Sequence, residues 1–191
     1  MSSILKVDTI QDSSGNNIIN ESGDTITIGA SGDTTNIIGT LQNDGVSVAN
    51  TPAFRAYLSS QQSITNGAYT KVIYQAEDFD TDSAYDTSNG RFTVPSGKAG
   101  KYIFTVQVQY TSVSDQTAMR HKFYKNGSDY NAVLNFQKTA SGTSDNYMQF
   151  TNVIDLAAGD YVESYAYHNE GGSRNFEANR NFFIGYKLIG A

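Results

Sequence analysis

The sequence has no cysteine and is short of basic residues, with thirteen lysines and arginines against nineteen acidic residues. Without cysteine the protein has no disulfide, no thiolate metal site and no cysteine nucleophile, so its stability must come from packing and assembly. The net charge of −6 repels nucleic acid phosphates and anionic lipids over long range. We therefore expect no nucleic acid partner.

Long hydrophobic runs are missing as well. The N-terminus reaches Lys6 and Asp8 before any apolar run develops, so it lacks the apolar stretch of a signal peptide. No later run approaches the length of a membrane span. We expect synthesis in the cytoplasm without membrane insertion, and release by a route such as lysis. With 38% hydrophobic and 17% charged residues, the chain should fold around a core.

Signatures of catalysis are also absent. The two histidines, His121 and His168, stand outside any His-x-x-x-His or Gly-x-Ser-x-Gly pattern, and we assign them to strand packing and to a polar loop. Gly97 and Lys98 lack the other residues of a phosphate-binding loop. The sequence predicts no catalytic residue and no cofactor. Carboxylate pairs for glycoside hydrolysis stay open, because their spacing is set by tertiary structure.

Aromatic residues divide the chain in two. All ten phenylalanines and thirteen tyrosines lie at or after Phe54, whereas residues 1–50 hold short apolar bursts separated by turn-forming Gly, Asn, Asp and Ser. In a monomer such short strands bury too little to offset the backbone entropy of ordering, about 1–2 kcal/mol per residue. The segment is either a flexible linker or a β thread of intertwined identical chains. Recurrent pairs of β-branched residues favour the thread.

Residues 51–191 are predicted to form an all-β domain. Phe104, Val106 and Val108 alternate with polar residues, which indicates a strand with one face toward a core. Asn126 and Gly127 predict a type I′ hairpin corner. Strands are expected at residues 53–58, 70–74, 91–94, 102–110, 118–125, 132–137, 147–156, 161–167 and 181–189.

Motifs in this half carry a resemblance to a known family. They are FDTDSAYDTSNGRFTVP at 79–95, AGKYIF at 99–104 and NFFIGYKLI at 181–189. They are similar to the globular-head family of complement and its tumour-necrosis-factor-like relatives, in which Gly-x-Phe-x-x-Pro and Gly-x-Tyr-x-Phe lead into the central strand of a jelly roll. The resemblance covers residues 53–190 and implies an obligate homotrimer, with Phe104, Phe183 and Tyr186 as candidates for the trimer core. The collagen stalk of the animal members is absent, since no three-residue glycine period precedes the domain.

The N-terminal residues resemble a different group of proteins. SSILKVDTIQDSSGNNIIN at 2–20 is similar to the opening of short fibre and decoration proteins of phages, especially marine and cyanobacterial phages (cyanophages). This resemblance implies that residues 1–50 dock the protein on tail, portal-proximal or capsid proteins of a virion and support trimerisation. The candidate docking residues are the apolar ones of the stretch: Ile4, Leu5, Val7, Ile10, Ile18 and Ile19.

Alternating carboxylates at Asp78, Asp80 and Asp82 are candidate calcium ligands. An EF-hand requires glycine where Ser83 stands and glutamate where Asn89 stands, so that type of loop is excluded. Either a jelly-roll loop holds a surface calcium through the three aspartates, or they lie on a solvated strand edge. The solvated edge is the preferred interpretation.

One expected connection has the composition of a binding surface. Residues 165–180 mix Tyr, His, Asn and Arg between two strands, and these residue types suit sugars or proteins. The candidate receptor contacts are Tyr165, Tyr167, His168, Asn169 and Arg174. The alternative is an ordinary solvated connection between strands.

Together these features predict an all-β homotrimer, with a jelly-roll β-sandwich head at 51–191 and an intertwined, short-stranded β thread at 1–50. The predicted function is a non-enzymatic structural protein of a bacteriophage virion surface, made in the host cytoplasm. As a short tail fibre, it would bind a host-surface glycan or protein with avidity from three heads. The alternative is a capsid decoration protein that reinforces the phage head. An enzyme acting on polysaccharide is the contrasting class, which nothing in the sequence favours.

Overall fold

The computed structural model describes residues 37–39, 41–43, 46–139 and 141–189. The six candidate docking residues lie outside the described residues: Ile4, Leu5, Val7, Ile10, Ile18 and Ile19. Every regular element among the described residues is a β-strand, which confirms the predicted all-β class. Residues Gln42–Ala191 form one compact unit.

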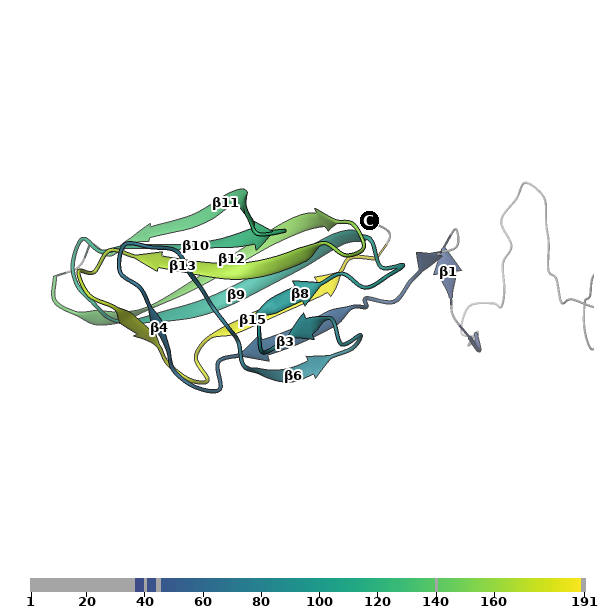
Figure 1. Ribbon diagram of the computed structural model, residues 1–191, viewed down its shortest axis with the longest axis horizontal. Coiled ribbons are helices and arrows are strands. Elements are labelled where there is room, and N and C mark those ends of the chain that lie inside the picture. The colour runs from purple at the N-terminus through teal and green to yellow at the C-terminus, as the bar shows by residue number, and fades with distance from the viewer. Residues whose placement is uncertain (1–36, 40, 44–45, 140, 190–191) are drawn as a thin grey trace, which may run out of the picture. The chain divides into compact units, whose positions relative to one another are not determined.

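Two antiparallel sheets form the two layers of a jelly-roll sandwich (Figure 1). The five-stranded sheet has the order β12 (Ser144–Leu156), β9 (Gly100–Val113), β15 (Phe182–Lys187), β3 (Ala53–Tyr57) and β6 (Ala76–Asp80). The six-stranded sheet has the order β11 (Ser128–Gln137), β10 (Ala118–Lys125), β13 (Tyr161–His168), β8 (Arg91–Thr93) and β7 (Tyr85–Asp86), with β5 (Thr70–Lys71) also paired to β13.

Two short strand pairs lie outside the main sheets. One is β4 (Gln62–Ile64) with β14 (Arg174–Phe176), which pair antiparallel. The other is β1 (Gln42–Asn43) with β2 (Val46–Ser47). The pairing of β4 and β14 ties the segment after β3 to the segment after β13, so two connections far apart in sequence meet at one place.

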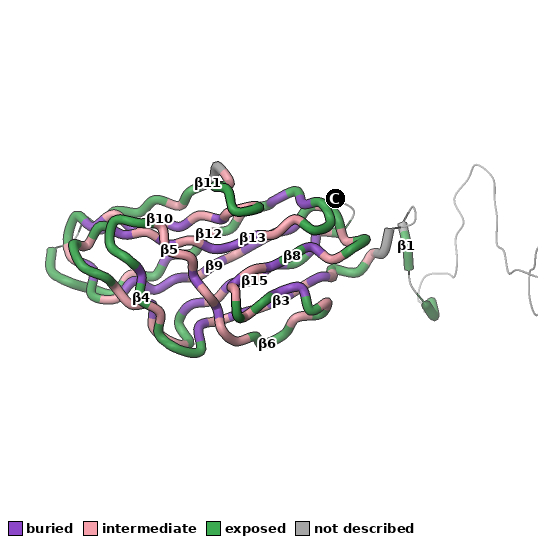
Figure 2. Tube along the Cα trace, in the orientation of Figure 1, coloured by how far each residue is buried: buried purple, intermediate pink, exposed green. Residues whose placement is uncertain are grey.

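Alternation along the strands builds the core between the sheets (Figure 2). On β9, Phe104, Val106 and Val108 are fully buried, as the sequence predicts. The core is largely aromatic: the Phe54 ring stacks on Phe92 at 5.2 Å between ring centroids and meets Phe183 edge-on at 5.0 Å. Offset and edge-on pairs of this kind contribute about 0.5–1.5 kcal/mol each beyond the area they bury.

Gly185 explains how so many rings fit between the sheets. It lies on β15 between Phe54 and Phe104, and a Cβ at this position would come within 2.6 Å of both rings. Because only glycine leaves this space, the Gly in the motif FFIGYK is required by packing against the rings and not by an unusual φ angle.

Two local predictions have different outcomes. The hairpin corner is confirmed: Asn126 and Gly127 both have positive φ, at 52° and 75°, and Lys125 pairs with Ser128 across the turn. The single strand expected at 70–74 is wrong, because β5 ends at Lys71. The chain then crosses to the other sheet, where β6 pairs with β3.

The trimer-core candidates divide into two groups. Phe104 and Phe183 have no exposed surface in the single chain, since both point into the sandwich and touch each other at 5.7 Å between ring centroids. The expectation that they face a three-fold axis is therefore corrected: their apolar surface is already used within one protomer. Tyr186 lies on the opposite face of the same sheet and is 38% exposed, so it remains available to a partner.

Candidate functional site

The five candidate receptor residues do not form one cluster. Tyr165 and Tyr167 are half-buried on β13 and alternate with the buried Ala166, so both stand on the outer face of the six-stranded sheet. Asn169 is exposed just after β13, and its Oδ1 accepts the backbone N–H of Ala118 at 2.7 Å. Arg174 begins β14.

His168 has no surface for a ligand, which corrects its place among the candidate receptor contacts. It is fully buried, and its Nε2 donates to the backbone oxygen of Ile64 at 3.0 Å. Its Nδ1 accepts the N–H of Glu170 at 3.3 Å. With both ring nitrogens bonded, the side chain fixes the connection after β13 to the end of β4.

Glu170 organises this end of the sandwich, although the sequence analysis gave it no role. Its carboxylate accepts hydrogen bonds from the backbone N–H and the hydroxyl of Ser114, from the hydroxyl of Thr117, and from Arg174 at 2.8 Å. Burial alone would raise the pKa of Glu170, but these hydrogen bonds lower it to about 2. Arg174 is thus engaged by Glu170 within the chain.

The outer face of the six-stranded sheet combines tyrosines with cations. Tyr167 lies opposite Arg120 of β10, and Tyr165 lies opposite Lys122. The Arg120 guanidinium sits 4.9 Å from the centroid of the Tyr167 ring. Further contacts extend the pattern: Lys122 lies 4.0 Å from the Tyr69 ring, Tyr124 stacks on Tyr165 at 3.9 Å, Tyr69 meets Tyr167 at 5.3 Å, and Arg91 lies 3.7 Å from the Tyr161 ring.

Most of these cations have a carboxylate partner. Lys71 and Arg91 share Glu163, at 3.0 Å and 2.8 Å, and that carboxylate is 2% exposed. Lys122 pairs with Asp129. Burial alone would lower the pKa of Lys122, but the hydrogen bond to Asp129 and the charge interactions with Asp129, Tyr69 and Tyr124 together raise it. Arg120 is the exception: its Nε donates to the amide oxygen of Asn135 at 3.2 Å, and no described carboxylate forms an ion pair with it.

The outer face of the five-stranded sheet has the opposite chemistry. Three neighbouring strands present a block of nine side chains without a charge: Ile103, Thr105 and Gln107 of β9, Gln149, Thr151 and Val153 of β12, and Phe182, Ile184 and Tyr186 of β15. We call it the uncharged face. Val153 is 45% exposed and Tyr186 38%. The hydroxyls of Thr105 and Thr151 bond each other at 2.8 Å, so the centre of the face is polar but internally satisfied.

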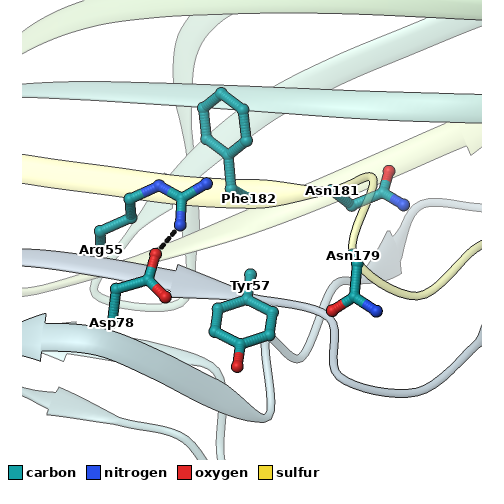
Figure 3. A pocket seen from close by; sticks show the side chains of 6 residues that line it. All are labelled: Arg55, Tyr57, Asp78, Asn179, Asn181 and Phe182. Atoms are coloured by element: carbon teal, nitrogen blue, oxygen red, sulfur yellow. Dashed lines mark ion pairs between the residues drawn. The ribbon is translucent and has the colours of Figure 1, made fainter.

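A shallow depression of about 270 Å³ lies at the edge of the uncharged face, on the side of β3 (Figure 3). Arg55 lies 5.1 Å from the centroid of the Phe182 ring and forms an ion pair with Asp78 of β6. Tyr57, Asn179 and Asn181 complete the lining. This ion pair lies beside the uncharged face, and Lys101 and Asp155, which face each other on β9 and β12, border it at another edge.

The three candidate calcium ligands have separate partners. Asp78 pairs with Arg55, Asp80 accepts the N–H of Tyr85 at 2.8 Å, and Asp82 lies 3.5 Å from the ammonium of Lys98. Among the described residues, no group of three or more His, Cys, Asp and Glu side chains could hold a metal ion. Asp78 lies exposed on the edge strand β6, whereas Asp80 and Asp82 are half-buried.

The side chains of His121 and Ser164 resemble a base and a nucleophile, with His121 Nε2 and Ser164 Oγ 2.9 Å apart. Both are fully buried, and Ser164 also contacts the hydroxyl of Tyr74 at 3.2 Å. Burial lowers the pKa of His121 to about 3, so the ring is neutral at physiological pH. A substrate cannot reach these atoms, and the group serves the packing role predicted for His121.

The outer face of the six-stranded sheet also contains residues that sequence reasoning missed. They lie on β10 and in the segment before β5, and they complete the surface of tyrosines and cations. Arg120, Lys122 and Tyr124 alternate with the buried Met119, His121 and Phe123. A period of two was therefore available as a signal that these three share the outer face. Tyr69 carried no such signal, because its contact with Tyr167 depends on how the chain crosses the sheet.

Comparison with known proteins identifies relatives of two kinds. The family profile described as "C1q domain" matches residues 53–188. The "Phage-like element PBSX protein XkdV" of Bacillus subtilis is 28% identical over 114 residues, which are 57% of this chain and 16% of the relative. The chain therefore spans about a sixth of the length of that relative.

Solved structures agree on the fold. The globular domain of the zebrafish complement 1qA protein matches 73% of this chain and 98% of that domain, with a TM-score of 0.54 and 17% identity. The Eiger TNF from S. frugiperda matches 75% of this chain and 96% of that protein, with a TM-score of 0.54 and 15% identity. Within the described residues, no helix has the length and hydropathy needed to cross a bilayer.

Proposed function

The chain belongs to the C1q domain family through residues 53–188, and from this membership we propose a non-enzymatic structural protein of a phage virion, acting as a homotrimeric short tail fibre. The relative from a phage-like element supports an association with phages. The thread at 1–50 docks on the virion, and the head at 51–191 projects from it toward the host surface. Heads of this family typically assemble as trimers.

The observation that carries the proposal is the uncharged face. Charged side chains are costly to bury in an interface, and the cores of protein interfaces are depleted of them. Nine uncharged side chains on β9, β12 and β15 let a second copy approach without desolvating a charge. The other sheet carries Lys, Arg, Asp and Glu on its outer face and remains free in such an assembly. The head thus has one face suited to assembly and another that stays exposed and can contact a ligand.

The non-enzymatic role rests on the interior position of the His121–Ser164 pair and on the family, whose domains are generally not enzymes. The test is to incubate the purified protein with host lipopolysaccharide or capsule. Chains of unchanged length are expected, and shortened chains would overturn this part of the proposal.

Two experiments test the virion role. Electron microscopy of whole particles should locate the protein on the tail, whereas density on local three-fold axes of the capsid would favour decoration instead. Deleting residues 1–50 should leave a folded head that is no longer incorporated into particles. Normal incorporation of the truncated protein would show that docking does not depend on the thread.

A further inference from the structure

Arg120 is the cation of the outer sheet face that differs from its neighbours. Lys71, Arg91 and Lys122 each contact a carboxylate within the sheet, whereas Arg120 forms no ion pair with any described residue. This guanidinium without a carboxylate partner lies on a chain whose net charge is −6. An anionic group would complete the pairing that the other three cations already have.

Two contacts orient the Arg120 guanidinium. Its Nε donates to Asn135 of β11 at 3.2 Å, and the group lies 4.9 Å from the centroid of the Tyr167 ring on β13. Both neighbours are direct cross-strand partners of Arg120, so the sheet fixes their positions. The terminal nitrogens of a guanidinium held in this way can bind a carboxylate, sulfate or phosphate through two parallel hydrogen bonds.

Rings extend the surface on one side of Arg120. The Tyr167 ring lies 5.3 Å from the Tyr69 ring between centroids. Tyr165 precedes Tyr167 by two residues on the same side of β13, a distance of about 7 Å along the strand. Tyrosines held by neighbours present rigid, amphipathic contact area with little loss of side-chain entropy, and their hydroxyls both donate and accept hydrogen bonds. Such a surface suits the C–H faces and hydroxyls of sugars.

From these contacts we propose that Arg120, with Tyr69, Tyr165 and Tyr167, forms a binding site for an acidic saccharide. The anionic group of one sugar pairs with Arg120, and neighbouring sugar units lie along the tyrosines. Since the net charge of −6 repels polyanions at a distance, the site recognises a short acidic saccharide by close contact and not by long-range attraction. Weak binding at each head gains avidity when three heads engage one surface.

The inference rests on the proposed function only for where such a saccharide is met, namely on a host surface. The binding site itself is a property of the full-length protein in solution. Binding and virion location are therefore measured separately, and either can fail without the other.

The test uses isothermal titration of the full-length protein with trigalacturonate, with its fully methyl-esterified form, and with galactose 6-sulfate. Binding of trigalacturonate is expected to be at least tenfold tighter than binding of the uncharged ester. Galactose 6-sulfate distinguishes a general anion site from one selective for carboxylates. Absence of binding to both anionic sugars would overturn the proposal.

Variants assign the binding to Arg120. Arg120→Gln should weaken trigalacturonate binding at least tenfold, to the level of the ester, whereas Arg120→Lys should lose less because it keeps the charge but not the paired hydrogen bonds. Arg180→Gln is the matched control, because Arg180 is exposed on the connection between β14 and β15, outside the site, and the change in charge is the same. Light scattering and thermal melting of each variant must match those of the unchanged protein. An equal loss in Arg180→Gln, or no loss in Arg120→Gln, would contradict the assignment.

Discussion

At the scale of single residues, the core of this domain depends on positions where one atom decides the packing. Gly185 gives two phenylalanine rings the space that a Cβ would occupy. His121 occupies an interior position that excludes its charged form. Both residues lie in ordinary strands, so their importance follows from what surrounds them and not from their own backbone.

Gly185→Ala should destabilise the head, because the new methyl group would overlap the rings of Phe54 and Phe104. Overpacking of this kind costs about 1–3 kcal/mol. The free energy of unfolding, measured with urea, should fall by that amount. Gly172→Ala is the control, since a Cβ there meets nothing within 4 Å, and it should leave stability nearly unchanged. Equal effects of the two changes would contradict the packing role of Gly185.

His121 should lower stability as the pH falls below its usual pKa. Glu77, whose pKa is raised by burial and by the nearby Asp80, acts in the opposite direction, because its folded form takes up a proton before the unfolded chain does. The pKa of His121 is about 3 in the folded state, below the usual value near 6.5. The unfolded chain therefore binds the extra proton first, so stability is complete above pH 6.5 and declines as the pH falls toward 3. Glu170 and Asp160, with pKa values of about 2, lose their contributions only below about pH 4.5.

Between pH 6.5 and 5 the unfolding free energy should thus decrease by about 1–2 kcal/mol, close to one proton over that range. Urea unfolding at pH 7, 6 and 5 measures the decrease. The dependence of the unfolding free energy on pH should become weaker in His121→Leu, which removes the titrating ring. A slope of the same size in that variant would show that another group is responsible.

At the scale of elements, long-range contacts fix the loops at one end of the sandwich. The connection between β9 and β10 carries Ser114 and Thr117, and the connection between β13 and β14 carries Glu170. These two segments are more than fifty positions apart in sequence, and one carboxylate holds them together. At this end of the sandwich a side chain therefore adds to the strand pairing of β4 with β14 in holding the connections together.

Glu170→Gln should loosen both connections, because the neutral amide pairs weakly with Arg174 and can bond fewer of the four donors. Glu170 is 1% exposed and Arg174 28%, so losing the charge-assisted hydrogen bonds is expected to cost about 1.5–3 kcal/mol. Hydrogen exchange should accelerate in residues 113–117 and 169–174. Glu177→Gln, whose carboxylate bonds only the exposed Gln61 side chain, is the control. Unchanged hydrogen exchange in Glu170→Gln would show that Glu170 does not hold the two connections together.

At the scale of the whole molecule, the centre of one sheet face lacks charged side chains, and its charges lie at the edges. The uncharged face has no ionic side chain among nine neighbouring positions, while the opposite sheet carries pairs centred on Glu163 and Asp129. A folded monomer does not require this separation, since exposed strand positions tolerate charge. The proposed assembly through this face would account for it.

Thr151→Lys places a charge at the centre of the uncharged face and should dissociate the trimer without unfolding the protomer. An exposed substitution of this kind changes the stability of a monomer by less than about 0.5 kcal/mol. Light scattering should report three times the chain mass for the unchanged protein and the chain mass of 20.8 kDa for the variant. Thr93→Lys, exposed on the other sheet, should remain trimeric. A monomeric unchanged protein would refute the assembly itself.

Much of the fold was predictable because it follows local rules. The alternation of Phe104, Val106 and Val108 and the turn at Asn126 and Gly127 are set by neighbours in sequence. The candidate sites were harder to predict. Tyr165 and Tyr167 lie on the outer face of the sheet, but His168 points inward, where Tyr110 of the facing sheet and Ile64 of β4 cover it.

The sequence by itself determined the all-β class, the aromatic core and the family, because these depend on periodicity and on motifs that are continuous along the chain. Tertiary structure alone decided which side chains share a surface. Phe104 turned out to be interior while Tyr186, on the same sheet, stayed exposed, and Arg120 met Tyr167 from another strand. The physical reason is that a strand fixes only the side to which a residue points, whereas the register between strands and the layer stacked above decide what it touches.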